Sequence, residues 1–344
     1  MKLIYICKKL EINQALGQRK RRKGLIDGIK NLNVEVHYVE LPTHFDLKRY
    51  IAVLFMVLRK RSDAKTRFFF EFERNFLLFY FCAGRGNSML DICDSRILLS
   101  KLDSRNTKNL ARKQLRLFAK KLFYGIFLAL TTHLFDLVSY ISESDMTADG
   151  KWLRANCQVV VLLNGIDDDL LSVGDLRNSK GSFLAVGDWS YQPNLEMLHC
   201  ILKASKDSQL LRERRIRIVG PNLPPIVLPD YVDYLPWVEE LIEVYRGCSF
   251  MLAPMFSGSG VKNKVLESAA VGIPVLGTEK TFIGLPKDIL KLCSIVDFAD
   301  YRSIEKIVDG FEADKHFANF RISNELVSWD QLVKVQLETW LSCE

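Results

Sequence analysis

Short runs of β-branched and aromatic residues alternate along the chain with longer stretches in which apolar positions recur every three or four residues. This alternation is typical of parallel α/β sheets, in which helices connect successive strands. In the first half, the pattern predicts strands at residues 2–7, 34–41, 67–72, 88–94, 137–141 and 158–163, and helices at 19–31 and 104–131. In the second half, it predicts strands at 183–187, 215–219, 232–234, 250–253, 274–277 and 294–296, and helices at 194–205, 238–246, 262–271, 303–310 and 324–341.

A polar segment with glycines and an acidic run, residues 164–182, separates the two halves. Such segments connect domains, and 344 residues suffice for two domains of ordinary size. We expect two doubly wound, Rossmann-like α/β domains facing a central cleft, where ligands of these folds bind at the carboxyl ends of strands. The expected division is a first domain at 1–165, a linker at 166–180, a second domain at 181–325, and a C-terminal helix at 326–344 that packs back across the domains.

The net charge of +7 comes from basic clusters in the first third of the chain, at residues 17–24, 47–50, 59–67 and 109–121. A basic surface suits an anionic partner such as a phospholipid surface, a polyprenyl phosphate or a nucleic acid, although it is equally compatible with a solvated face. The aromatic stretch FFFEFERNFLLFYF, residues 68–81, lies between these clusters. It suits either peripheral contact with an anionic leaflet or a core strand and helix. Because no nucleic-acid-binding motif accompanies it, we expect no nucleic acid as partner.

The eight cysteines form no CxxC pair, and most lie in apolar, strand-like contexts. This usage is typical of buried thiols in a reducing compartment, so we expect a cytoplasmic protein, with peripheral contact to the inner face of the membrane left open. The five histidines are dispersed without ligand spacing, so no metal site is predicted. The apolar stretch at residues 122–142 is interrupted by His133 and Asp136, which favours a buried helix running into a buried strand over a membrane span.

The stretch FSGSGVKNKVLESAAVGIPVLGT, residues 256–278, combines a glycine-rich loop, two cations and a carboxylate. Gly258 and Gly260 allow backbone N–H groups to approach an anion closely at the start of a helix. Lys262 and Lys264 add formal charge, and Glu267 can accept hydrogen bonds from vicinal hydroxyls such as those of a ribose. The alternative is a turn followed by an ordinary surface helix. Neither a Walker A loop nor a GxGxxG fingerprint is present.

A second group of candidates follows predicted strands of the first half. Gly17, Gln18 and Arg19 come after the first strand, where they can contact phosphates or an acceptor, or form a basic surface loop. Asp94 ends a later strand, where it can orient an acceptor hydroxyl or cap the following helix. No histidine at this rim is identifiable as a base.

The block GVKNKVLESAAVGIPVLGT resembles the nucleotide-sugar-binding segment of retaining GT-B glycosyltransferases of family 4, the glycosyl transferases group 1. Other stretches similar to this family follow in matching order, from residue 138 to residue 331. They are VSYISESD, NGID, FLAVGDWSYQPN, IRIVGPN, VDYLPWVEEL, YRGCSFMLAPM and SWDQ. The first 130 residues, where acceptor-side domains diverge, resemble the family only weakly.

The resemblance implies roles for individual residues. Lys262 matches the family's Arg or Lys on the donor diphosphate and is the expected catalytic group together with Asp94, and Glu267 matches the glutamate that binds the ribose. Gly187 is expected to let the donor-domain turn approach the phosphates. The expected donor site comprises Gly187, Tyr234, Leu235 and Pro236 near the base, and Gly258, Ser259, Gly260, Val261, Lys262, Asn263, Lys264 and Glu267 around the diphosphate and ribose.

One position departs from the family pattern, because Ser259 stands where many members carry a first glutamate against the transferred sugar. The implied activity is transfer of a sugar, with retention, from a nucleotide-sugar donor to a saccharide or lipid-linked acceptor, in surface polysaccharide or glycoconjugate assembly. No cofactor and no essential metal are expected, because lysines and N–H dipoles supply the positive charge. A non-catalytic nucleotide-sugar-binding or partner protein of the same fold is the alternative. A GT-B epimerase lacks its expected histidine and carboxylate cluster.

Overall fold

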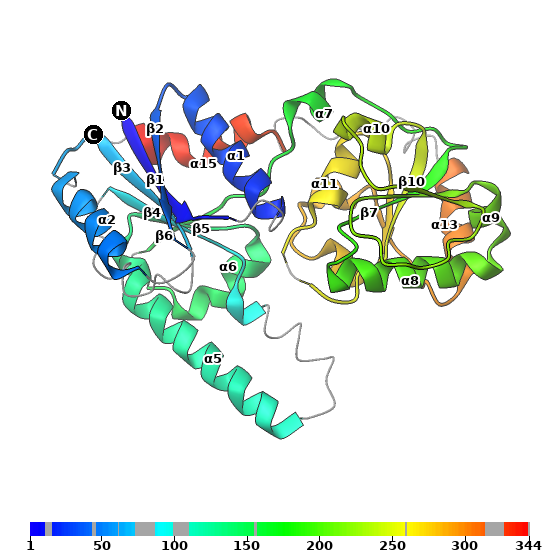
Figure 1. The fold of residues 1–344 in the computed structure, drawn as a ribbon, viewed down its shortest axis with the longest axis horizontal. Coiled ribbons are helices and arrows are strands. Elements are labelled where there is room, and N and C mark those ends of the chain that lie inside the picture. Colours follow the sequence, from blue (N-terminus) through cyan, green and yellow to red (C-terminus); the bar gives the residue numbers. More distant parts are fainter. Residues whose placement is uncertain are drawn as a thin grey trace. The chain divides into compact units, whose positions relative to one another are not determined.

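The computed structural model describes residues 1–10, 16–42, 46–60, 62–72, 87–98, 110–154, 157–258, 260–313 and 327–342. The chain forms two compact units (Figure 1): unit 1 contains Met1–Gly165 and Trp329–Glu344, and unit 2 contains Ile166–Ser328. In the described part of the chain, every helix is too short or too polar to cross a membrane.

Unit 1 contains a parallel sheet of six strands in the order β2-β1-β3-β4-β5-β6. Its strands are β1 (Lys2–Lys8), β2 (Glu35–Leu41), β3 (Thr66–Glu71), β4 (Ser88–Cys93), β5 (Leu137–Tyr140) and β6 (Gln158–Val161). All six strands were predicted, with ends that differ by one or two residues. The chain order reverses between β1 and β3, so the carboxyl ends of these two strands form a topological switch point.

Helices cover both faces of this sheet. On one face, α1 (Leu16–Asn31) and α15 (Trp329–Ser342) share a core cluster with inward side chains of the strands. On the other face, α2 (Leu47–Lys60) and α5 (Leu110–Thr131) share a second cluster. The C-terminal helix α15 thus packs on unit 1, against α1. A Cβ on Gly24 would lie 2.2 Å from the buried Trp329 ring, so glycine at this position in α1 makes room for the indole.

The described part of unit 1 also contains short helical elements. They are η3 (Thr132–Leu134), α6 (Glu143–Asp149) and η4 (Gly150–Trp152).

The aromatic stretch enters the core rather than the surface over its described part. Phe68 and Phe70 belong to the cluster under α2 and α5, while Phe69 belongs to the cluster under α1 and α15. A strand that is covered on both faces is apolar at every position, so the membrane-contact interpretation is wrong for residues 68–72. The rest of the stretch lies outside the described residues.

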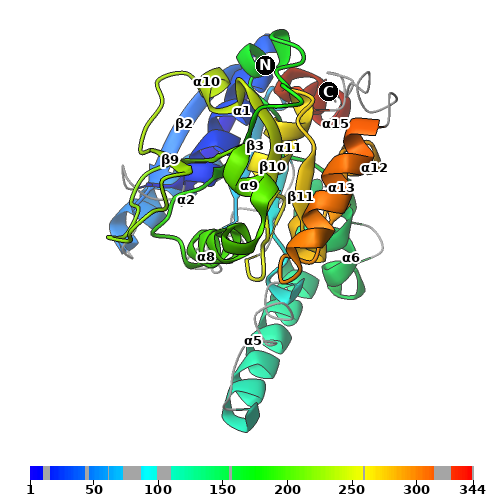
Figure 2. The same cartoon turned by 90° about the vertical axis from the view of Figure 1, so that its right-hand side faces the viewer.

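The apolar segment at residues 122–142 forms the end of α5, η3 and β5, but the helix is only half buried. Tyr124, Phe127 and Leu128 pack into the core, whereas Leu122 and Phe123 are exposed. The prediction of a buried helix is therefore wrong for one face of α5, and the amphipathic helix α2 was not predicted at all. Figure 2 shows α5 extending away from the sheet of unit 1.

Unit 2 contains a second parallel sheet of six strands, in the order β12-β11-β10-β7-β8-β9. Its strands are β7 (Ser182–Val186), β8 (Ile216–Val219), β9 (Val232–Leu235), β10 (Cys248–Ala253), β11 (Val275–Gly277) and β12 (Cys293–Ile295), all within two residues of prediction. Its helices are α7 (Asp168–Ser172), α8 (Gln192–Asp207), α9 (Gln209–Glu213), α10 (Leu241–Tyr245), α11 (Asn263–Ala270), η5 (Glu279–Phe282), α12 (Lys287–Leu290) and α13 (Tyr301–Ala313). The chain order reverses between β7 and β10, which makes their carboxyl ends the expected ligand-binding edge.

Candidate functional site

The residues predicted to bind a donor converge on the switch point of unit 2. Gly187 directly follows β7, and the glycine-rich loop follows β10 and leads into α11. Strands β7 and β10 are hydrogen-bonded neighbours. Two stretches separated by about 70 residues in the sequence therefore meet at one edge of the sheet, where open α/β sheets bind ligands.

The loop has the backbone conformation that its glycines predict. Gly258 has φ +84° and Gly260 has φ +70°, values that favour glycine because a Cβ is strained there. Ser259 between them lies outside the described residues. Lys262 is buried, and its Nζ donates a hydrogen bond of 2.6 Å to the carbonyl oxygen of Gly260. This contact holds the cation against the loop that it follows.

The predicted helix begins one residue later than expected. Lys262 is the N-cap of α11, Asn263 is its first residue, and Val261 before it is buried. The first turn of α11 thus combines the partial positive charge of a helix N-terminus with the two lysines.

Lys264 is half-buried beside the turn that follows β7. Its Nζ donates a hydrogen bond of 2.8 Å to Oδ1 of Asn194 and lies 3.7 Å from Sδ of Met197. Desolvation and the positive charge of Lys262 lower the pKa of Lys264, Glu267 opposes both effects, and the net pKa is about 7. Near neutral pH this side chain is therefore poised between its charged and neutral forms.

Gly187 and Lys264 are linked through Asn194. A Cβ on Gly187 would lie 2.7 Å from Cγ of Asn194, so glycine at this position leaves room for the amide that holds the lysine. Nδ2 of Asn194 donates to the backbone oxygen of Asp188 at 2.9 Å, which fixes the orientation of the amide. Asn194 was not among the predicted site residues, although its place in the first turn after GDWSYQP was a usable signal.

Glu267 is buried on α11 and is held by a residue that the prediction missed. Its Oε2 accepts a hydrogen bond of 2.7 Å from the hydroxyl of Tyr245, at the end of α10. Burial and the charge of Glu267 raise the pKa of Tyr245 well above its usual value, so the tyrosine stays a donor. The tyrosine hydroxyl thereby fixes the position of the carboxylate.

The predicted base-contact residues Tyr234, Leu235 and Pro236 lie at and beyond the end of β9. The hydroxyl of Tyr234 donates a hydrogen bond of 3.1 Å to the carbonyl oxygen of Gly220, so it supports the turn after β8. Leu235 and Pro236 are exposed. The neighbouring Trp237, which was not predicted, is 79% exposed.

In unit 1, Gly17, Gln18 and Arg19 lie in the first turns of α1, next to the end of β1. Nε2 of Gln18 donates a long, 3.4 Å hydrogen bond to Oε2 of Glu71, and Nη2 of Arg19 donates to the carbonyl oxygen of Leu10 at 3.1 Å. These contacts place the residues at the switch point of unit 1.

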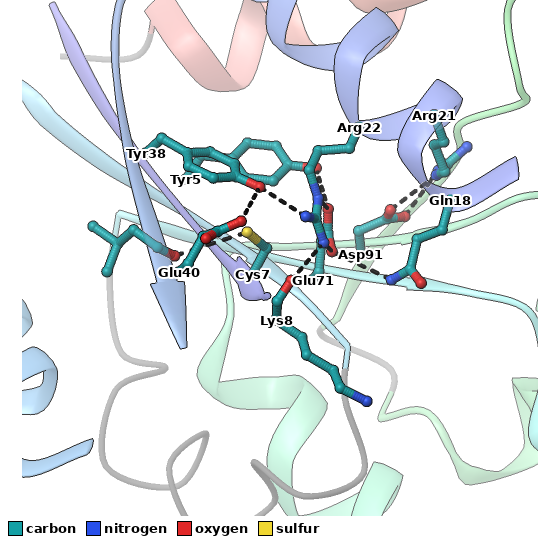
Figure 3. Close-up of polar contacts among 11 residues, drawn as sticks. Tyr5, Cys7, Lys8, Gln18, Arg21, Arg22, Tyr38, Glu40, Glu71 and Asp91 are labelled. Carbon is teal, nitrogen blue, oxygen red and sulfur yellow. Dashed lines mark hydrogen bonds and ion pairs between the residues drawn. The ribbon is translucent and has the colours of Figure 1, made fainter. Parts of the chain in front are cut away.

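Two arginines of the same basic run are buried in ion pairs (Figure 3). Arg21 donates to both carboxylate oxygens of Asp91 at 2.9 and 3.0 Å, and Arg22 donates to both oxygens of Glu71 at 2.6 and 2.7 Å. The Tyr5 hydroxyl adds a hydrogen bond of 2.9 Å to Glu71. The interpretation of residues 17–24 as a continuous basic face is therefore wrong at Arg21 and Arg22, whose charges are compensated inside the unit.

Asp94 follows β4 and is half-buried, directly after Cys93 at φ +61°. The hydroxyl of Ser95 accepts a hydrogen bond of 3.0 Å from the backbone N–H of Leu98. Because this is the contact that an N-cap makes, the capping alternative considered for Asp94 is fulfilled by Ser95. Among the residues that the structure describes, no group of three His, Cys, Asp or Glu side chains is placed to hold a metal ion.

Comparison with known proteins bears on this site directly. Residues 180–291, which contain all of the residues predicted to bind a donor, match the family model described as Glycosyl transferases group 1. A comparison with curated proteins found no match.

Solved structures similar to this chain span almost its whole length. Sucrose-phosphate synthase from Thermosynechococcus elongatus matches with a TM-score of 0.61 and 11% identity, over 99% of this chain and 96% of that one. Anabaena HepE in complex with UDP and glucose matches with a TM-score of 0.59 and 11% identity, over 99% and 97%. UDP-GlcNAc 2-epimerase from Methanocaldococcus jannaschii matches with a TM-score of 0.56 and 12% identity, over 97% and 99%.

Identities this low show a likeness of fold alone. The family match and the fold nevertheless agree with each other, and both agree with the resemblance drawn from the sequence. The resemblance is confirmed for the family description and for the fold: residues 180–291 match the glycosyl transferases group 1 model, and the chain has the fold of two Rossmann-like domains that GT-B glycosyltransferases share.

Proposed function

We propose that the protein is a glycosyltransferase that moves a sugar from a nucleotide-sugar donor to a saccharide or lipid-linked acceptor, with retention of configuration. The observation that carries this proposal is the grouping of Lys262, Lys264 and Glu267 at the switch point of unit 2. Two cations and a fixed carboxylate there complement a nucleoside diphosphate, which offers two phosphates and vicinal ribose hydroxyls.

In this proposal the chain stabilises the leaving group. Departure of a nucleoside diphosphate concentrates negative charge on its terminal phosphate, and donors placed in advance in a site of low dielectric stabilise that charge. Lys262 and the first-turn N–H groups of α11 contact the diphosphate, and Lys264 becomes fully charged beside it. Glu267, positioned by Tyr245, accepts hydrogen bonds from the ribose hydroxyls.

The remaining roles follow from the predicted residues. Gly187 lets the turn after β7 approach the phosphates, and Tyr234, Leu235 and Pro236 lie near the base. In unit 1, Asp94 orients the acceptor hydroxyl, and Gly17, Gln18 and Arg19 contribute to the acceptor side. Because the lysines and N–H dipoles supply the countercharge, we expect no cofactor and no essential metal, and transfer should persist in the presence of EDTA.

UDP-sugars are the first donors to test, since a solved structure of the same fold, Anabaena HepE, contains UDP and glucose. Six of the eight cysteines lie among the described residues, and all six are free thiols. Burial raises the pKa of Cys7 and of Cys293 to about 12, so both stay protonated and unreactive. These features suit a reducing, cytoplasmic setting, where polysaccharide and glycoconjugate precursors are assembled.

The test is a panel of UDP-, GDP- and ADP-sugars, scored for transfer to saccharide and lipid-linked acceptors and for slow hydrolysis of the donor. Turnover with one donor that disappears in Lys262→Ala supports the proposal. Nucleotide-sugar binding without turnover on any acceptor supports the alternative, a non-catalytic nucleotide-sugar-binding or partner protein. The same samples, followed by NMR, detect epimerised donor, which would indicate an epimerase instead.

A further inference from the structure

Two helices of unit 1 carry large apolar side chains that are exposed to solvent, in addition to those that they bury in the core. Helix α2 exposes Leu47, Ile51, Phe55 and Leu58, and α5 exposes Phe118, Leu122, Phe123, Ile126 and Leu130. The three phenylalanines are the most exposed, at 68% for Phe55 and 64% for Phe118 and Phe123. Both helices cover the same face of the sheet, and large apolar side chains exposed together on one face indicate an interaction site.

The exposed residues of α2 form their own stripe. Leu47, Ile51 and Phe55 recur every four residues and lie on one side of the helix, whereas Tyr50, Val53 and Val57 form the buried stripe. The apolar arc of α2 is therefore wider than the part that packs on the sheet. Among the described residues, Leu47, Ile51 and Phe55 do not belong to the core cluster under α2 and α5.

The second half of α5 is apolar on every side. No charged residue occurs from Leu122 to Thr131, although Leu122, Phe123, Ile126 and Leu130 face outward. Helices that are apolar all round are normally buried. A half-exposed helix of this composition indicates that a further apolar phase covers it.

The charges of the same two helices are of one sign. Helix α2 carries four lysines and arginines and no acidic residue, and α5 carries five and no acidic residue. Together they account for more than the whole net charge of +7. Each residue advances an α-helix by about 100°. The exposed Lys48 and Arg59 of α2 therefore lie within roughly 100° of the stripe that Leu47, Ile51 and Phe55 form. Cations that flank an apolar stripe are the pattern of helices that lie in the interface of an anionic membrane.

A groove in unit 1 joins this surface. It has a volume of about 930 Å³ and is lined by Ile97, Phe118, Leu122, Trp152, Lys121 and Lys151, among others. Phe118 and Leu122 of the exposed α5 face thus form one wall. The remaining lining includes the polar residues Glu143, Ser144 and Thr147, so the groove combines an apolar wall with a polar one that carries two lysines.

We propose that the exposed faces of α2 and α5 form a docking surface for an anionic lipid bilayer, in which the phenylalanines enter the acyl region and the lysines and arginines contact phosphate headgroups. A second copy of this chain is the weaker occupant, because a symmetric contact would bring the two like-charged helices of each copy together. This surface replaces the aromatic stretch at residues 68–72, which the core uses.

The test uses the full chain without nucleotide, so its result is independent of the proposed transferase activity. Binding is measured by co-sedimentation with vesicles of phosphatidylcholine alone and of phosphatidylcholine mixed with phosphatidylglycerol. We expect binding to the mixed vesicles that weakens as salt increases, and little binding to the neutral ones. Phe55→Ser and Phe123→Ser should each weaken partitioning about tenfold, from the usual contribution of a buried phenylalanine.

Matched variants separate membrane docking from general effects. Val335→Ser, on α15, removes a side chain that is 71% exposed on the other face of unit 1, and it should bind vesicles as the wild type does. Lys48→Gln and Arg59→Gln should each weaken binding roughly fivefold, while Lys203→Gln in unit 2 should not. Circular dichroism melting confirms that each variant folds.

Three outcomes would overturn the proposal. The wild-type protein fails to bind anionic vesicles, or the α2 and α5 variants bind them as tightly as Val335→Ser does. The third is a dimer in solution that Phe123→Ser dissociates, in a protein that does not bind vesicles, which would assign the surface to a second copy.

Discussion

Binding of a nucleoside diphosphate should drive uptake of a proton by Lys264. In the free protein, the net effect of desolvation and neighbouring charges lowers the pKa of this side chain to about 7. A dianionic phosphate beside Nζ favours the charged form and should return the pKa toward its ordinary value near 10.5. The complex then holds more protons than the free protein throughout the range between these two values.

The size of the effect follows from the two pKa values. At pH 8, about one tenth of the free protein is protonated at Lys264 and nearly all of the complex is, which gives an uptake of about 0.9 proton. At pH 6 the uptake falls to about 0.1 proton, because the free lysine is already charged. The affinity should accordingly fall roughly tenfold for each pH unit above 7. The terminal phosphate has a pKa near 6, so at pH 8 it takes up no proton itself.

Calorimetric titration with UDP at pH 8, in two buffers of different ionisation enthalpy, measures the number of protons directly. Lys264→Gln should abolish the uptake and weaken binding, whereas the matched variant Lys203→Gln, with an exposed lysine on α8, should change neither. An uptake below about 0.3 proton in the wild type, or the same uptake in Lys264→Gln, would show that Lys264 does not contact the diphosphate.

The other predictions concern the surroundings of the lysines and the core of unit 1. Glu267→Gln should lower nucleotide affinity about tenfold, from the loss of charge-assisted hydrogen bonds, with an unchanged melting temperature; equal affinity would remove Glu267 from the ribose site. Gly187→Ala should displace Asn194 and weaken UDP binding by titration calorimetry without unfolding the protein, and unchanged binding would contradict the link to Lys264. Arg21→Met should cost about 3–5 kcal/mol of unfolding free energy in urea, because Asp91 is left buried and unpaired. A loss below about 1 kcal/mol would contradict this account.

The strands were predictable because short runs of apolar residues in the sequence indicate buried strands. A strand of a parallel sheet that is covered on both faces is a short apolar run, and β1, β3, β4 and β10 are buried at most or all of their positions. The donor loop was predictable for a local reason as well, because the positive φ angles of Gly258 and Gly260 are a property of the glycines themselves.

The contacts that shape the site depend on tertiary structure and are absent from any local pattern. Asn194 holds Lys264 across 70 residues, and Tyr245 holds Glu267 from another helix. The sequence shows two lysines of equal charge, yet only the fold shows that burial and a neighbouring cation bring the pKa of one of them to about 7. The formal charges in the sequence were therefore a poor guide to the protonation state of Lys264.

The same limit explains why the basic run at residues 17–24 was misread. On a helix, Arg21 and Arg22 lie about 100° apart and therefore point to different strands of the sheet. Arg21 pairs with Asp91 near the end of β4, and Arg22 pairs with Glu71 at the end of β3. Each carboxylate is separated from its arginine by about 50 to 70 residues. A count of charges along the chain treats these arginines as surface, although the fold neutralises them.

For apolar side chains, the sequence did not show which of them the fold covers. The apolar side chains that stay exposed are the strongest argument for a membrane-docking surface. Phe68 and Phe70 lie in β3, between two neighbouring strands and beneath helices, so a strongly apolar stretch there is fully covered. Phe123 lies in a charge-free apolar stretch of α5, residues 122–131, but this helix has a sheet on one side only. Hydropathy reports how much apolar surface must be removed from water, while the fold decides how much of it the chain can cover itself. In α2 and α5, apolar side chains that the chain does not cover lie beside basic residues. An anionic bilayer complements both the apolar side chains and the positive charges.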